Sequence, residues 1–145
     1  MTLVRLGRAV LTASVAAFGC GTTQPSGIDL DIEITAVEEQ PEPMGGATVA
    51  FTVTNVGETS VWLERCGDRL MTFVDVRVGG GWEYYRGDIC PAVHVMSPWE
   101  LPPGATRTGS RGIQEAGYYR LRFGTAADPA HTTNWIVASP PFVVS

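Results

Sequence analysis

The side chains with the most chemical potential in this chain are three cysteines, Cys20, Cys66 and Cys90, and two histidines, His94 and His131. A serine or cysteine nucleophile needs a positioned base, and the sequence has no Gly-x-Ser-x-Gly elbow that would mark one. Both histidines lie in sequence without strand or helix periodicity. A dispersed triad has no local signature, so on these residues we expect a protein that is not an enzyme and uses no cofactor.

The two later cysteines have a spacing that suits a disulfide. Cys66 and Cys90 flank a segment that alternates apolar and polar residues, enters Gly79-Gly80-Gly81 and returns through Trp82 to Tyr85. This pattern predicts a β-hairpin with a cysteine at each end. Closing a loop of this length contributes roughly 3.5 kcal/mol in the chain-entropy account. We expect a disulfide between Cys66 and Cys90, which leaves Cys20 as the odd thiol.

One short motif could bind a metal ion. His94-Val95-Met96 places an imidazole and a thioether on one face of a strand, a pair that suits a soft ion such as Cu(I). Met71 lies upstream as a third donor, but a fourth matching ligand is missing. The alternative is a loop histidine beside an apolar methionine. We expect no bound metal and keep a periplasmic copper-binding protein as the lesser alternative.

Tryptophan and tyrosine are too numerous to lie entirely in a small core. The inward positions of the expected strands already hold Ile, Leu, Val and Phe. Amphipathic rings are favoured at surfaces that recognise proteins or glycans. We therefore name Trp82, Tyr84, Tyr85 and Trp99 as the candidate binding surface. The alternative is that these rings only cap the open ends of the domain.

The strands that would position these groups follow from an alternation with a period of two residues. The segments that show it are residues 28–35, 48–54, 60–64, 70–78 and 117–123, with 82–85 as the return of the hairpin. Residues 91–112 contain four prolines and predict a loop with short edge strands at most, near 92–96 and 105–110. Residues 124–133 predict a polar loop, and 135–144 a last strand interrupted by Pro140-Pro141. No helical period is present, so we expect an all-β, antiparallel β-sandwich of about seven strands.

The first 19 residues have the features of an export signal. Arg5 and Arg8 precede a ten-residue apolar run, and small residues precede Cys20. Ten helical residues rise only about 15 Å, half of what a bilayer core requires. Residues 17–20, Ala-Phe-Gly-Cys, resemble the lipobox of bacterial lipoproteins, although Ala17 and Phe18 depart from it. The resemblance implies an acylated Cys20, carrying chains such as palmitate, and the alternative is ordinary signal-peptidase cleavage after Gly19.

These features divide the chain into a lipoprotein signal peptide at 1–19, a tether at 20–27 and one domain at 28–145. By resemblance to lipoproteins of double-membraned bacteria, Gly21 after the cysteine favours the outer membrane. We therefore expect an exported protein held in the cell envelope by a lipid anchor on Cys20. Loss of residues 1–19 leaves eight arginines and no lysine against 15 acids, a net charge of −7, which argues against a nucleic-acid partner.

The order of strands and turns resembles a known family. The chain reads FTVTNVGETSVWL, then the hairpin, then LPPGATRT and GYYRLRF. These runs resemble the immunoglobulin-like sandwich domains of bacterial lipoproteins of unknown function, and their layout is similar to the BsuPI-type intracellular proteinase inhibitor domain. The resemblance covers most of residues 28–144. It implies an immunoglobulin-like β-sandwich in which Tyr119 holds the tyrosine corner, its hydroxyl bonded to backbone upstream.

The same resemblance implies function less directly than fold. We expect a non-enzymatic cell-envelope lipoprotein with a protein- or ligand-binding module, whose partner is an envelope protein or a glycan. The alternative is a protease inhibitor that presents the 66–90 hairpin. The tip around residues 79–82 is the stretch suited to enter a protease.

Overall fold

The computed structural model describes residues 28–41, 45–91, 97–130 and 135–145. The fold of these residues is all-β, as the sequence predicts, and they contain no helix that could cross a membrane. The strands are β1 (Leu30–Glu39), β2 (Ala47–Asn55), β3 (Val61–Leu63), β4 (Arg65–Cys66), β5 (Arg69–Leu70), β6 (Phe73–Val78), β7 (Gly81–Gly87), β8 (Trp99–Leu101), β9 (Thr106–Ile113), β10 (Gly117–Ala126), β11 (Trp135–Ala138) and β12 (Phe142–Val144).

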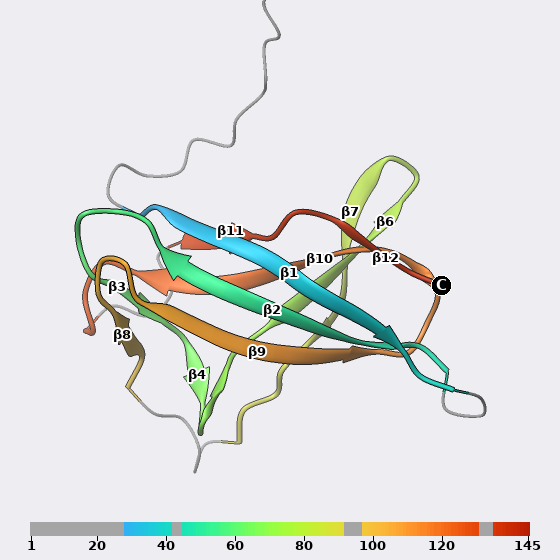
Figure 1. The fold of residues 1–145 in the computed structure, drawn as a ribbon, viewed down its shortest axis with the longest axis horizontal. Coiled ribbons are helices and arrows are strands. Elements are labelled where there is room, and N and C mark those ends of the chain that lie inside the picture. The colour runs from blue at the N-terminus through green and yellow to red at the C-terminus, as the bar shows by residue number, and fades with distance from the viewer. Residues whose placement is uncertain (1–27, 42–44, 92–96, 131–134) are drawn as a thin grey trace, which may run out of the picture.

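The strands form two layers, an antiparallel β-sandwich (Figure 1). The three-stranded sheet has the order β1-β2-β9, and the seven-stranded sheet has the order β7-β6-β10-β3-β8 with β11 and β12 also paired to β10. A two-stranded hairpin, β4-β5, lies beside them. The long strand β10 is the centre of the larger sheet because β6 and β3 pair with one of its edges and β11 and β12 with the other.

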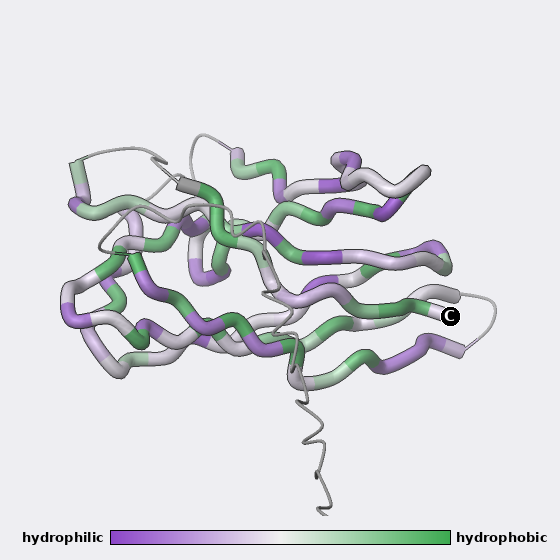
Figure 2. Tube along the Cα trace, turned by 90° about the horizontal axis from the view of Figure 1, so that it is seen from above, coloured by the Kyte–Doolittle hydropathy of each residue, from purple (hydrophilic) through white to green (hydrophobic). Residues whose placement is uncertain are grey.

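The core lies between the two layers. Hydrophilic and hydrophobic residues alternate along the strands (Figure 2), which is the pattern of sheets with one face in water. Phe51 of β2 and Phe123 of β10 meet edge to face across the core, with ring centroids 5.1 Å apart. The largest fully buried side chains are Tyr119, Phe51, Phe123, Leu63, Leu101, Ile113, Leu121, Val49, Val53, Val61, Val74 and Val144.

The predicted hairpin and its disulfide are confirmed. Cys66 and Cys90 form a disulfide with a Cα–Cα distance of 5.5 Å. At the other end, Gly79 and Gly80 have φ of 55° and 89°, which makes the tight turn that glycine permits. The tip of β6-β7 projects beyond the rest of the sandwich in Figure 1. The predicted strand 70–78 is divided in two, because β5 ends at Leu70 and β6 begins at Phe73.

Two stretches predicted to be loop form strands instead, and one predicted edge strand is longer than expected. Residues 99–101 form β8, the predicted edge strand at 105–110 extends to Ile113 as β9, and residues 124–126 continue β10 instead of opening a polar loop. Thr125 and Ala126 pair with β3, so tertiary pairing overrides their weak local signal. The break at Pro140-Pro141 separates β11 from β12 as expected. The edge strand predicted at 92–96 lies outside the described residues.

The motifs that carried the family resemblance form the corners of the sandwich. Gly104 has φ of 75°, and the Ala105 N–H donates to the Pro102 carbonyl at 3.0 Å, which is a type II turn with Pro103 and Gly104 at its centre. Tyr119 is buried, and its hydroxyl donates to the Glu115 carbonyl at 2.9 Å. This is the upstream backbone bond of a tyrosine corner.

Candidate functional site

The structure describes only some of the candidate site residues named from the sequence. Cys20, His94 and Met96 lie outside the described residues, so the lipid anchor stays a prediction and copper binding stays the lesser alternative. Cys66 and Cys90 are joined to each other and offer no free thiol. Within the described ranges, no group of three or more His, Cys, Asp or Glu side chains could hold a metal ion.

An aromatic and cationic patch covers the outer face of the larger sheet around Trp82. Trp82 of β7 stacks on Tyr118 of β10, with ring centroids 5.9 Å apart and planes at 24°. The Arg120 guanidinium lies 4.6 Å from the Trp82 ring centroid, and that of Arg77 lies 5.4 Å from it. Tyr84 completes the patch and is 64% exposed. We call Arg77, Trp82, Tyr84, Tyr118 and Arg120 the Trp82 face.

The register of the strands explains why these side chains share a face. Directly opposite residues of an antiparallel pair point to the same side of the sheet. Arg77 pairs with Trp82, and Asp75 pairs with both Tyr84 and Arg120. Tyr118 lies two residues from Arg120 on β10 and pairs with Val143, which is 59% exposed. Three strands, β6, β7 and β10, therefore contribute to the Trp82 face, and Val143 of β12 lies on the same side of the sheet.

A buried carboxylate supports the arginines of this surface. Asp75 is 3% exposed, although it lies on the outward side of β6. Arg120 Nη2 lies 2.9 Å from Asp75 Oδ2, and Arg122 Nε donates to Asp75 Oδ1 at 2.8 Å. Charge-assisted bonds of this kind hold long side chains in fixed positions. Arg120 is therefore oriented over Trp82 before any partner arrives.

Two of the four aromatics named from the sequence lie elsewhere. Tyr85 packs against the core, and its ring meets Tyr119 edge to face at 5.3 Å. Trp99 is also partly buried against the core, with the guanidinium groups of Arg65 and Arg107 at 5.1 Å and 4.9 Å from its ring centroid. A bulge between Val74 and Asp75 shifts the β6-β7 pairing, so the alternation alone could not assign Tyr85 to a face.

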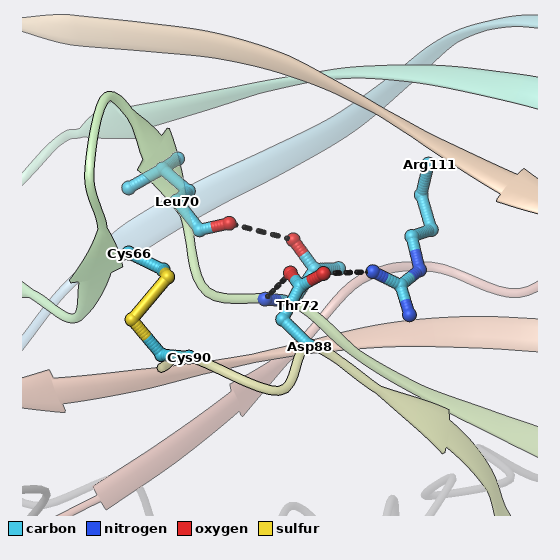
Figure 3. A network of polar contacts seen from close by, with 6 residues as sticks. All are labelled: Cys66, Leu70, Thr72, Asp88, Cys90 and Arg111. Atoms are coloured by element: carbon cyan, nitrogen blue, oxygen red, sulfur yellow. Dashed lines mark hydrogen bonds and ion pairs between the residues drawn. A yellow bond between two sulfur atoms is a disulfide. The ribbon is translucent and has the colours of Figure 1, made fainter. Parts of the chain in front are cut away.

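A polar cluster lies next to the disulfide and was not recognised in the sequence (Figure 3). The Asp88 carboxylate accepts the Thr72 backbone N–H at 2.9 Å and forms an ion pair with Arg111 of β9. The Asp88 N–H in turn donates to the Thr72 carbonyl at 3.1 Å. Arg111 comes from the smaller sheet and Asp88 from the end of the hairpin. The cluster therefore joins the two layers, a contact that only the tertiary fold defines.

The fold and the Trp82 face define an all-β sandwich domain with a candidate recognition surface. No family model matches the chain, and no curated protein sequence matches it. Among solved structures, the chain is similar to the putative ApaA protein from Bordetella pertussis, with a TM-score of 0.56, 14% identity, and coverage of 82% of this chain and 94% of that one. At that identity the likeness concerns the fold alone.

Two other solved structures are more distant. An X-ray structure of a structural genomics consortium target has a TM-score of 0.46 at 14% identity, over 81% of this chain and 85% of that one. A β-glucosidase from Listeria innocua in complex with glucose has a TM-score of 0.38 at 10% identity, and only 16% of that enzyme is covered. Neither similarity bears on function.

Proposed function

We propose that this protein is a non-enzymatic, exported binding module that recognises an envelope protein or a glycan through the Trp82 face. The observation that carries the proposal is Trp82 stacked on Tyr118 with Arg77 and Arg120 over its ring. Tryptophan, tyrosine and arginine are the residues most enriched at binding hot spots. The ion pairs with Asp75 fix Arg120 in advance, so less side-chain entropy is lost on binding.

A glycan array and photo-crosslinking in the native envelope test this surface. We expect the unmodified protein to bind, and Trp82→Ala to lower its affinity more than about tenfold, as truncation of a hot-spot residue does. Trp62→Ala is the matched control, because Trp62 is a half-buried tryptophan of the same sheet but lies on β3, outside the Trp82 face. Equal losses in the two variants, or no loss in either, would exclude the Trp82 face as the recognition surface.

We also propose that Cys20 anchors the module in the membrane of a bacterial envelope. The disulfide pairs the other two cysteines, so an acylated Cys20 would account for the odd thiol. Intact mass of the protein from its native membrane tests this. We expect a chain that starts at Cys20 and carries three acyl chains, and a gain of two protons on reduction. An unmodified Cys20 thiol would reject the anchor and indicate a secreted protein.

The hairpin tip supports a second candidate function, inhibition of a protease. The turn at Gly79-Gly80 is narrow and exposed, and it projects from the sandwich (Figure 1). An inhibitor needs such a preorganised, protruding segment. The test is a panel of serine, cysteine and metalloproteases, with Gly81→Pro and Trp82→Ala as variants at the tip. No inhibition of any of them by the unmodified protein would remove this candidate.

A further inference from the structure

A groove runs between the edge of the smaller sheet and the disulfide-tied hairpin. Its volume is about 520 Å³, within the range of ligand-binding clefts. The walls come from β9 on one side and from β5, the end of β7 and the segment after it on the other. The residues that line it are Phe51, Asp68, Arg69, Leu70, Arg86, Asp88, Thr108, Gly109, Ser110, Arg111 and Gly112.

The β9 wall is an unpaired strand edge. β9 pairs with β2 along one side, and within the described part of the chain no backbone hydrogen bond reaches its other side. Five consecutive residues, 108–112, line the groove, so the groove follows the edge of the strand and not one of its faces. At Gly112 an added Cβ would meet nothing within 4 Å. The N–H and C=O groups of such an edge can pair with an added strand.

The opposite wall carries two exposed arginines, and the groove as a whole has a small net positive charge. Arg69 and Arg86 are exposed and form no ion pair with any described residue. Arg111 is paired to Asp88, but its Nε is buried and has no hydrogen-bond acceptor among the described residues. A buried donor without an acceptor is unfavourable, and guanidinium groups favour carboxylates as partners. Asp68 and Asp88 leave the groove with a net positive charge in a chain that is acidic overall.

We propose that this groove binds an extended acidic peptide segment, which adds as a strand to the free edge of β9. Its backbone pairs with residues 108–112, and its carboxylates bind Arg69 and Arg86. A free strand edge beside two exposed arginines that form no ion pair with a described residue suits a chain that is both extended and acidic. A small anion would leave the edge unused. The groove shares no residue with the Trp82 face, so this site is independent of the function proposed above.

Fluorescence anisotropy with a labelled, capped hexapeptide of alternating valine and glutamate tests the proposal on the full protein. We expect binding that weakens more than about tenfold in Arg69→Gln/Arg86→Gln. Both arginines are exposed, so the variant keeps the fold. Amide spectra of the unmodified protein should place the shifts at residues 108–112. The single variants Arg86→Gln and Glu83→Gln are a matched pair, because each replaces one exposed charged residue of β7 by glutamine and only Arg86 lines the groove.

Two further peptides separate the parts of the interaction. Replacing glutamate by glutamine should weaken binding, since the arginines lose their carboxylate partners. N-methylation of alternate backbone amides should abolish it, since the peptide can no longer donate to β9. Equal binding of either peptide, equal effects of Arg86→Gln and Glu83→Gln, or displacement of the hexapeptide by an equal concentration of free glutarate would each overturn the proposal. Absence of binding would overturn it as well.

Discussion

Asn55 lies fully buried where three segments of the chain meet. Its side-chain Nδ2 donates to the carbonyls of Thr59 and Leu101, each at 2.8 Å, and its Oδ1 accepts the Gly57 N–H at 3.0 Å. Its backbone N–H donates to the Ala105 carbonyl and its carbonyl accepts the Gly104 N–H, which joins it to the type II turn at Pro103-Gly104. The sequence marks this residue only as part of a turn. Its role as the link between two distant turns depends on contacts that no local pattern encodes.

Replacing Asn55 by alanine should therefore destabilise the fold severely. Asn55→Ala removes the bonds to the buried Leu101 carbonyl, the Thr59 carbonyl and the Gly57 N–H, so we expect the free energy of unfolding to fall by about 2–4 kcal/mol. Urea denaturation followed by tryptophan fluorescence measures this. Gln114→Ala, an exposed polar truncation, should stay within about 0.5 kcal/mol of the unmodified protein. Similar losses of unfolding free energy in the two variants would show that the Asn55 hydrogen bonds do not stabilise the fold.

Tyr119 predicts a dependence of stability on alkaline pH. Burial, followed by the negative charges of Tyr85 and Glu115, raises the pKa of the Tyr119 hydroxyl above 10.0. In the unfolded chain the Tyr119 hydroxyl ionises at about pH 10. The stability that this group contributes is therefore fully present below that pH and is lost as the pH rises through its higher pKa in the folded protein. Tyr119→Phe removes both the titration and the bond to Glu115.

We expect Tyr119→Phe to lower the free energy of unfolding by about 1 kcal/mol at neutral pH. The difference from the unmodified protein should narrow above about pH 10. Urea denaturation between about pH 8 and about pH 11 checks this range. Tyr84→Phe, at a tyrosine that is 64% exposed, is the control for loss of a surface hydroxyl and should stay within about 0.5 kcal/mol of the unmodified protein at neutral pH. A difference for Tyr119→Phe that does not change with pH would contradict the argument.

At the scale of elements, the strands that sequence predicts best are those with one clean apolar face. β1, β2, β6 and β10 follow that alternation. β9 was underestimated because it presents Arg107, Gly109 and Arg111 towards the buried side of β2, where a strand pattern would have apolar residues. The Trp82 face was predicted in part, through Trp82 and Tyr84. Its arginines and Tyr118 come from strands whose pairing depends on long-range contacts.

The disulfide stabilises a single element, the hairpin, because it joins its two ends over a sequence separation of 24 residues. We expect Cys66→Ala/Cys90→Ala to lose about 3.5 kcal/mol of unfolding free energy, chiefly because the unfolded chain regains entropy. Reductant should lower the stability of the unmodified protein by the same amount and leave the double variant unchanged. Cys20→Ala is the matched control and should have no effect on domain stability. A loss under about 1 kcal/mol would mean that the disulfide adds little to the contacts around Asp88.

For the whole molecule, the arginines connect the two layers where the sandwich is open. Arg107 reaches from β9 to the ring of Trp99 on β8, and Arg111 reaches from the same strand to Asp88. Both arginines lie opposite fully buried valines of β2, so they point into the space between the sheets. Charged residues that point inwards along an edge strand discourage pairing between copies. The same edge is the one proposed above to accept an acidic peptide.

This arrangement predicts that the two arginines keep the protein monomeric. Arg107→Val/Arg111→Val would make β9 a longer apolar edge strand, and we expect it to self-associate with rising concentration in analytical ultracentrifugation. Arg107→Lys/Arg111→Lys keeps the inward charges and should remain a monomer. Circular dichroism distinguishes association of folded copies from unfolding. Arg107→Val alone leaves the ion pair between Asp88 and Arg111 in place and should associate more weakly than the double variant. A folded double-valine variant that stays monomeric at every concentration would mean that something other than these charges protects the β9 edge.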